Sequence, residues 1–127
     1  MQRTLLFMQF AVVVALATLH IFALENDLYW KFQWFDLMTH FLGGMWAALF
    51  FYWIGFSVGR ASNLLLAIGG ALLLGLMWEF FELAAGISNA PNYVSDTLID
   101  LLMDVVGAMF VAIAVKSILL VRREYNS

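Results

Sequence analysis

Four long apolar runs constrain this chain more than any other feature of its sequence. Each is roughly 20 residues long, the length at which a helix rising about 1.5 Å per residue crosses a hydrocarbon core about 30 Å thick. Short polar segments separate the runs, and short connections favour antiparallel neighbours. We therefore expect an all-α membrane protein, a four-transmembrane-helix antiparallel bundle, as a single transmembrane domain over residues 1–127. The expected helices span about residues 4–24, 36–58, 62–85 and 97–121.

The composition excludes several other classes of protein. Apolar residues make up 65% of the chain and charged residues 12%, against about 45–50% and about 25% in soluble domains. This leaves too little polar surface to coat a water-soluble fold. The chain has no cysteine, which excludes disulfides and thiolate metal sites. The net charge is −3 and no basic block is present, so we expect no nucleic-acid partner.

Basic residues predict the orientation of the bundle. Arg3, Arg60 and the Arg122–Arg123 pair fall at the N-terminus, in the second connection and at the C-terminus. In a four-span chain these places share one side of the membrane, and loops rich in Lys and Arg face the cytoplasm. We therefore expect both termini in the cytoplasm and a multi-pass protein of the cell (inner) membrane.

The acidic residues gather toward the opposite, outer side. On this topology every Asp and Glu except Glu124 falls in the outer half, together with both histidines. Spacings of three or four residues place several of them on shared helix faces. The spaced sets are Asp36 with His40, Glu79 with Glu82, and Asp96 with Asp100 and Asp104.

Burying several carboxylates together requires something that neutralises them. An ionised Asp at mid-membrane costs about 2.5–3.5 kcal/mol on insertion scales. Lys31 is the only Lys or Arg on the expected outer side, so salt bridges cannot balance the charge. Shared protons or a divalent metal ion remain. Three residues also have simpler interpretations: Asp36 and Asp96 suit helix caps, and His20 suits a hydrogen-bonded structural role.

A divalent metal ion fits the residue types best. One His with several carboxylates suits Zn²⁺, Mn²⁺ or Fe²⁺, whereas carboxylates alone suit Mg²⁺ or Ca²⁺. A bound ion lowers the pKa of a ligated water, and Glu82 is the candidate catalytic residue, as general base. The expected metal ligands are Asp36, His40, Glu79, Asp100 and Asp104.

The same residues carry a resemblance to a known family. The series Asp36-x-x-x-His40 with Gly43-Gly44, Trp78-Glu79-x-x-Glu82, and Asp96-x-x-x-Asp100-x-x-x-Asp104-x-x-Gly107 resembles the VanZ-like small membrane proteins of bacteria. It is most similar to the YjdF-like inner membrane family, over roughly residues 30–110. Leu37, Glu82 and Asp104 replace the Lys, Gln and Asn of the VanZ pattern. The resemblance implies a multi-pass cell-membrane protein and the same site positions, but no particular activity.

Three functions remain open at this point. The first is a metal site near the outer face that acts on lipid or lipid-linked cell-envelope substrates. The second is a proton or cation transporter or channel subunit, although the inner half of the chain offers few polar residues for a path. The third is a membrane scaffold or accessory subunit without catalysis. Membrane lipids are the expected partners, and glycine-lined helix faces allow a homo-oligomer. The residues do not decide whether a reaction is catalysed.

Overall fold

Helices account for nearly all of the chain that the structure describes. The computed structural model describes residues 1–32, 34–59, 64–86 and 92–125, without the side chains of residues 122 and 123. Its helices are α1 (Gln2–Glu25), α2 (Leu28–Lys31), α3 (Trp34–Ser57), α4 (Leu64–Ala85) and α5 (Tyr93–Tyr125). Four of them are long and apolar enough to cross a membrane. The described ranges contain no strand, so the expected all-α four-helix membrane bundle is confirmed.

The helix boundaries differ from expectation mainly at α5 and α2. Three of the long helices begin and end within two residues of the expected positions. Helix α5 starts at Tyr93 rather than 97, because the Asp96 amide already donates to the Asn92 carbonyl. The single turn of α2 was not expected, and it follows Asp27, which has a left-handed φ of 56°. Arg60, Pro91 and the Arg122 and Arg123 side chains lie outside the described residues.

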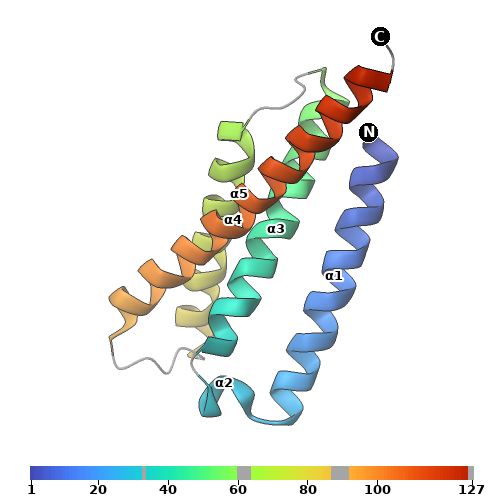
Figure 1. Ribbon diagram of the computed structural model, residues 1–127. Coiled ribbons are helices and arrows are strands. Elements are labelled where there is room, and N and C mark those ends of the chain that lie inside the picture. The colour runs from blue at the N-terminus through green and yellow to red at the C-terminus, as the bar shows by residue number, and fades with distance from the viewer. Residues whose placement is uncertain (33, 60–63, 87–91, 126–127) are drawn as a thin grey trace.

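Helix α3 is the central element of the bundle (Figure 1). It packs against α1, α4 and α5, and α4 and α5 also pack against each other. Among the described long helices, α1 contacts only α3. The bundle is therefore a unit of three helices with α1 attached to one side. Both chain termini lie at one end, which we call the terminal end, and α2 lies at the opposite end, the α2 end.

The apolar core occupies the terminal half of the bundle. Its side chains come from the second half of α3, the first half of α4 and the middle of α5. Helix α1 adds Leu5, and Gln9 donates a 3.5 Å hydrogen bond to the Leu49 carbonyl of α3. The buried members are Leu5, Ala47, Ala48, Leu49, Tyr52, Ala67, Ala71, Ala108, Val111 and Val115. The half of the bundle toward α2 is thus left for the polar residues.

Candidate functional site

Helix α3 contributes two side chains of the site from its first two turns. Asp36 and His40 lie four residues apart and therefore share a helix face. His40 is buried, at 5% exposure, whereas Asp36 is half-buried nearer the helix start. The Thr39 hydroxyl donates to the Asp36 backbone carbonyl at 2.8 Å and contacts Asp36 Oδ1 at 3.4 Å. Asp36 thus stands at the rim of the site and His40 inside it.

Helix α4 contributes Glu79, which two residues of α5 hold in place. The Thr97 hydroxyl donates to Glu79 Oε2 at 2.6 Å. The Tyr93 hydroxyl donates to the backbone carbonyl of Glu79 at 3.0 Å. Glu79 is 4% exposed. These two hydrogen bonds join the end of α4 to the start of α5 and leave Glu79 Oε1 for contacts with α3.

Helix α5 contributes the two most deeply placed carboxylates. Asp100 is 2% exposed and Asp104 is 4% exposed, one helical turn apart. At about 1.5 Å per residue, Asp104 lies about 16 Å along the axis from the first residue of α5. The site is therefore submerged within the membrane-spanning part of the helix and not confined to its end.

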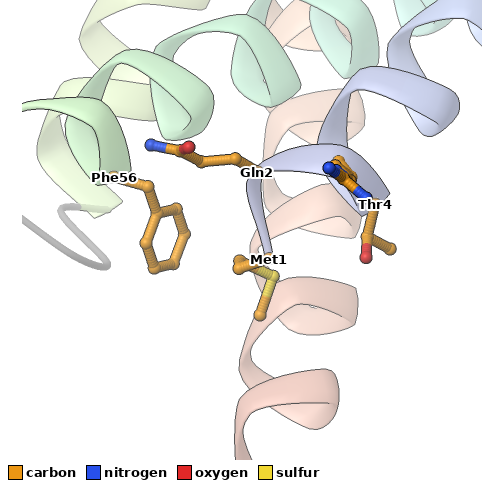
Figure 2. A pocket seen from close by; sticks show the side chains of 5 residues that line it. Met1, Gln2, Thr4 and Phe56 are labelled. Atoms are coloured by element: carbon orange, nitrogen blue, oxygen red, sulfur yellow. The ribbon is translucent and has the colours of Figure 1, made fainter.

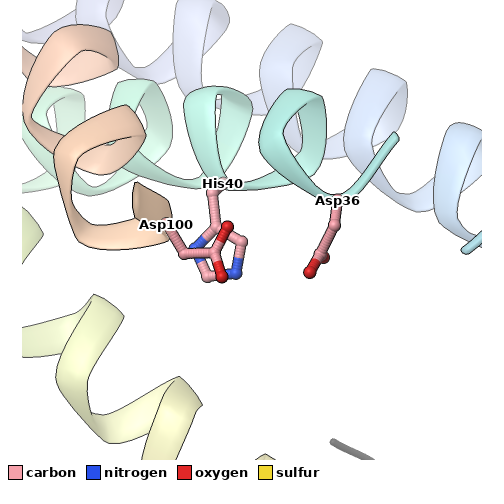
Figure 3. A group of neighbouring side chains, drawn as sticks. All are labelled: Asp36, His40 and Asp100. Atoms are coloured by element: carbon pink, nitrogen blue, oxygen red, sulfur yellow. The ribbon is translucent and has the colours of Figure 1, made fainter. Parts of the chain in front are cut away.

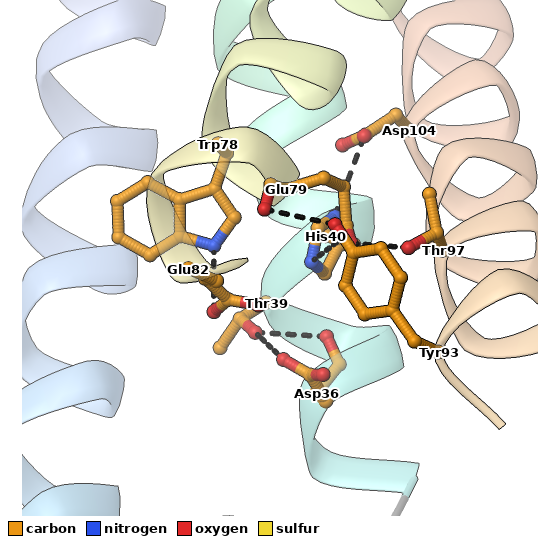
Figure 4. A network of polar contacts seen from close by, with 9 residues as sticks. All are labelled: Asp36, Thr39, His40, Trp78, Glu79, Glu82, Tyr93, Thr97 and Asp104. Atoms are coloured by element: carbon orange, nitrogen blue, oxygen red, sulfur yellow. Dashed lines mark hydrogen bonds and ion pairs between the residues drawn. The ribbon is translucent and has the colours of Figure 1, made fainter. Parts of the chain in front are cut away.

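His40 is the point at which these helices meet (Figure 4). Its Nε2 lies 3.5 Å from Glu79 Oε1, and its Nδ1 lies 3.4 Å from Asp104 Oδ2. One ligand atom each from Asp36, His40 and Asp100 lies within 4.8 Å of the other two (Figure 3). Helices α3, α4 and α5 thus bring all five predicted ligand residues close to one imidazole ring, three of them in one compact group.

Three buried atoms of this site have no hydrogen-bond partner among the residues that the structure describes. They are His40 Nε2, Glu79 Oε1 and Asp100 Oδ1. Although the first two are only 3.5 Å apart, their geometry does not make a hydrogen bond. A buried polar atom left unpaired costs about 1–3 kcal/mol, and more when it is charged. Such a cost at three atoms from three helices indicates that something else satisfies them.

Basic side chains do not neutralise the site in the described part of the chain. Both ion pairs there involve His40. Lys31, the basic residue at the α2 end, donates to the backbone carbonyl of Asn26 at 2.8 Å. The negative charge is therefore balanced by the histidine, by protons or by a cation.

Comparison with known proteins gives a family for the chain. A family model described as "Predicted membrane protein (DUF2238)" matches residues 3–120. The chain belongs to this family. No curated protein matches it, and no solved structure matches it. The match supports a multi-pass membrane protein and gives no evidence for the VanZ-like or YjdF-like families specifically, so that resemblance stays an interpretation.

Glu82 lies beside the buried group of this DUF2238 protein. It is half-buried, its Oε1 accepts a 3.0 Å hydrogen bond from Trp78 Nε1, and it interacts electrostatically with Asp36, Glu79 and His40. Sequence analysis did not predict the roles of Thr39, Thr97 and Tyr93. Helical spacing could have indicated Tyr93 and Thr97. They lie four residues apart, and Thr97 lies three residues before Asp100, so all three share one face of α5.

His20 contacts Tyr29 of α2 and not one of the buried carboxylates. Its Nδ1 lies 2.6 Å from the Tyr29 hydroxyl, and the two rings meet edge to face with centroids 5.6 Å apart. Burial raises the pKa of Tyr29, so the phenol stays protonated and is able to donate to the ring nitrogen. The contact gives His20 the hydrogen bond that the simpler interpretation expects, and it fastens α2 to α1.

A surface pocket lies at the terminal end, far along the bundle from the carboxylates. Met1, Gln2, Arg3, Thr4 and Phe56 line it (Figure 2). The Gln2 side chain donates a 3.3 Å hydrogen bond to the Ser57 hydroxyl beside this pocket. Its lining holds no carboxylate or imidazole, so the candidate chemistry of the protein lies at the α2 end.

Proposed function

We propose that this membrane protein binds one divalent metal ion between α3, α4 and α5. The single observation that carries the proposal is the set of three buried, unpartnered atoms around His40. All three can donate a lone pair, the His40 nitrogen when that position is unprotonated. A divalent cation between them removes the cost of unpaired burial and balances the carboxylate charge at once.

The distances suit a small cation. Ligand atoms about 2.0–2.2 Å from Zn²⁺ lie about 3.3–3.6 Å apart when the coordination is tetrahedral. His40 Nε2 and Glu79 Oε1 are 3.5 Å apart. The group of Asp36, His40 and Asp100, within 4.8 Å, brings two further carboxylates near the same ring, so a small inward movement would complete a coordination shell. One imidazole with several carboxylates favours Zn²⁺, Mn²⁺ or Fe²⁺ over Mg²⁺ and Ca²⁺.

The proposal places this site near the outer face of the bacterial inner membrane. Arg3 lies at the terminal end, and the positive-inside rule assigns that end to the cytoplasm. The half-buried carboxylates Asp36 and Glu82 then face the outer headgroup region. Lipids and lipid-linked envelope precursors are the substrates that meet a site at this depth.

Hydrolysis is the reaction class that this arrangement favours. A bound divalent ion makes a ligated water more acidic. Glu82, close to the buried group yet half-exposed, is the side chain suited to take up the proton as general base.

One specific observation favours a second candidate, a proton-handling site without metal. His40 lies 3.5 Å from Glu79 and 3.4 Å from Asp104, distances that also suit a protonated imidazole between two carboxylates. This arrangement leaves Asp100 Oδ1 without a partner. We therefore rank it second.

Elemental analysis of the protein purified without chelator tests the proposal. Wild type is expected to hold one metal ion per chain, and Asp100→Asn is expected to hold none. Asp27→Asn is the matched control, because Asp27 is exposed in a left-handed turn that Asn adopts readily. Wild type that neither contains metal nor binds added Zn²⁺ or Mn²⁺ would overturn the proposal and favour the proton-handling alternative.

A further inference from the structure

The carboxylate of Asp104 lies in a cradle made of glycines. A Cβ atom added at Gly75 of α4 would overlap Asp104 Oδ2, and one added at Gly44 of α3 would overlap the Asp104 backbone. A Cβ at Gly43 would stand 3.7 Å from Asp104 Oδ1. The space for this carboxylate therefore depends on Gly75, while Gly44 allows the Asp104 backbone to approach α3 and a Cβ at Gly43 would make ordinary van der Waals contact with the carboxylate.

This cradle directs one oxygen of Asp104 to one nitrogen of His40. Asp104 Oδ2 lies 3.4 Å from His40 Nδ1. A carboxylate oxygen accepts hydrogen bonds, so the contact favours the ring form with its proton on Nδ1. The lone pair of a neutral ring is then on Nε2, which is the unpartnered nitrogen that faces Glu79.

We propose that Asp104 is a positioning residue, held by Gly75, that orients His40 for the metal and is not itself a ligand. This inference rests on the proposed function. Metal-binding histidines generally donate their second ring N–H to a carboxylate or carbonyl, which fixes the ring and its protonated nitrogen. The sequence predicts Asp104 as a metal ligand. In this proposal its carboxylate instead accepts the hydrogen bond from His40 Nδ1.

Two features separate Asp104 from the ligand candidates. Both of its oxygens lie outside the set of unpartnered buried atoms, whereas Asp100 and Glu79 each have one inside it. It is also outside the compact group of Asp36, His40 and Asp100. It lies on the Nδ1 side of the ring, away from the unpartnered Nε2, where a carboxylate orients the imidazole without reaching an ion bound at Nε2.

Gly75 offers a way to disturb Asp104 without changing it. In Gly75→Ala the new methyl group meets the end of a flexible side chain, so the carboxylate moves and the helix backbones stay. Gly69→Ala is the matched control on the same helix, because a Cβ at Gly69 meets nothing within 4 Å. The methyl added in Gly75→Ala reaches the Asp104 carboxylate and the end of the Leu101 side chain, 3.0 Å from Leu101 Cδ2, whereas the methyl added in Gly69→Ala reaches neither.

Co²⁺ binding to the full chain in detergent tests the inference. Wild type and Gly69→Ala are expected to bind Co²⁺ equally, with Gly75→Ala weaker by about tenfold and Asp104→Leu weaker by about 10–100-fold. Asp104→Asn is expected to recover most of the affinity, because its side-chain oxygen still accepts from Nδ1. X-ray absorption should count the same number of Co²⁺ ligands in every variant that binds.

The possible failures are distinguishable from one another. Wild type that binds no Co²⁺ overturns the proposed function, and this inference with it. If wild type binds but Asp104→Asn loses as much affinity as Asp104→Leu, or loses one Co²⁺ ligand, Asp104 is a ligand and only the inference is wrong. Equal affinity in Gly75→Ala and Gly69→Ala would also overturn the inference, even if Asp104→Leu failed to fold.

Discussion

His40 is the side chain around which the buried carboxylates of this protein gather. It is the described residue of the site that contacts carboxylates on both α4 and α5, through different ring nitrogens. At 5% exposure it is removed from water, so each of those contacts forms in a low-dielectric environment. Under the proposed function, removing the ring would therefore remove a metal ligand and the contacts of α3 with Glu79 and Asp104 together.

Substitutions of the two histidines, His40 and His20, test this role. His40→Gln is expected to abolish stoichiometric metal binding, because Gln has a similar reach but no imidazole nitrogen. The loss of metal affinity should exceed the roughly 10–100-fold loss expected when Asp104, the hydrogen-bond partner of the ring, is replaced by Leu. His20→Gln is the control and is expected to keep full occupancy, since His20 contacts Tyr29 instead. Isothermal titration with Zn²⁺ measures both, and equal loss in the two variants would contradict the assignment.

Residue spacing predicted which polar groups are buried, but not how they pair. Four of the five expected metal ligands, His40, Glu79, Asp100 and Asp104, are buried, and the fifth, Asp36, is half-buried. The contacts of Thr97 and Tyr93 with Glu79 depend on the rotation of α5 against α4. Periodicity within one helix does not encode that rotation, because it compares residues of the same helix only.

At the scale of helices, glycine sets how closely α3 and α5 approach. A Cβ at Gly107 of α5 would overlap the Phe41 carbonyl, and one at Gly44 of α3 would overlap the Asp104 carbonyl. Both contacts are with backbone atoms, which cannot rotate away. Small residues at such crossings let helix backbones pack closely in membranes.

Substitution at the α3–α5 crossing is expected to lower the free energy of unfolding, whereas Gly75→Ala should not. Gly107→Ala is expected to lower the free energy of unfolding by about 1–3 kcal/mol, because overpacking at a backbone contact forces the helices apart. Gly69→Ala should be neutral or stabilising by up to about 1 kcal/mol, as Ala favours helix over Gly. Thermal unfolding in detergent micelles compares them. A Gly107→Ala protein as stable as Gly69→Ala would show that the crossing tolerates a wider spacing.

The positions of the long helices along the chain were predictable from the sequence, but which helix packs against which was not. Apolar length fixed the positions of α1, α3 and α4 to within two residues. The attachment of α1 to α3 alone had no counterpart in the sequence, since α1 has no pronounced polar face that would indicate its neighbour. The turn of α2 was missed because four residues between two long spans carry no helical period of their own.

For the whole molecule, the orientation in the membrane is a prediction that labelling decides. The chain has no cysteine, so single-cysteine variants report one position each. Asn92→Cys, exposed at the α2 end, should react with a membrane-impermeant maleimide in intact spheroplasts. Tyr125→Cys, 93% exposed at the terminal end, should react only after permeabilisation. The reverse pattern would place the candidate metal site at the cytoplasmic face.

The arrangement of polar and apolar halves argues against a path through the protein. The polar cluster ends where the apolar core begins, at Ala47, Ala71 and Ala108, one from each of the three packed helices. A partly hydrated ion crossing this core would lose its water without gaining ligands, which is as unfavourable as burying any unpaired charge. The buried polar cluster therefore lies between the half-buried Asp36 and Glu82 toward the α2 end and the apolar core toward the terminal end.

This geometry predicts binding without transport. Proteoliposomes that contain the protein and enclose a fluorescent Zn²⁺ indicator should take up Zn²⁺ no faster than protein-free liposomes, while the same protein in detergent binds the ion. An ionophore added at the end of each trace confirms that the indicator responds. Uptake that depends on the protein and is lost in Asp100→Asn would make the cluster part of a permeation path, in which case a second copy of the chain or a rearrangement of α5 must open the apolar core.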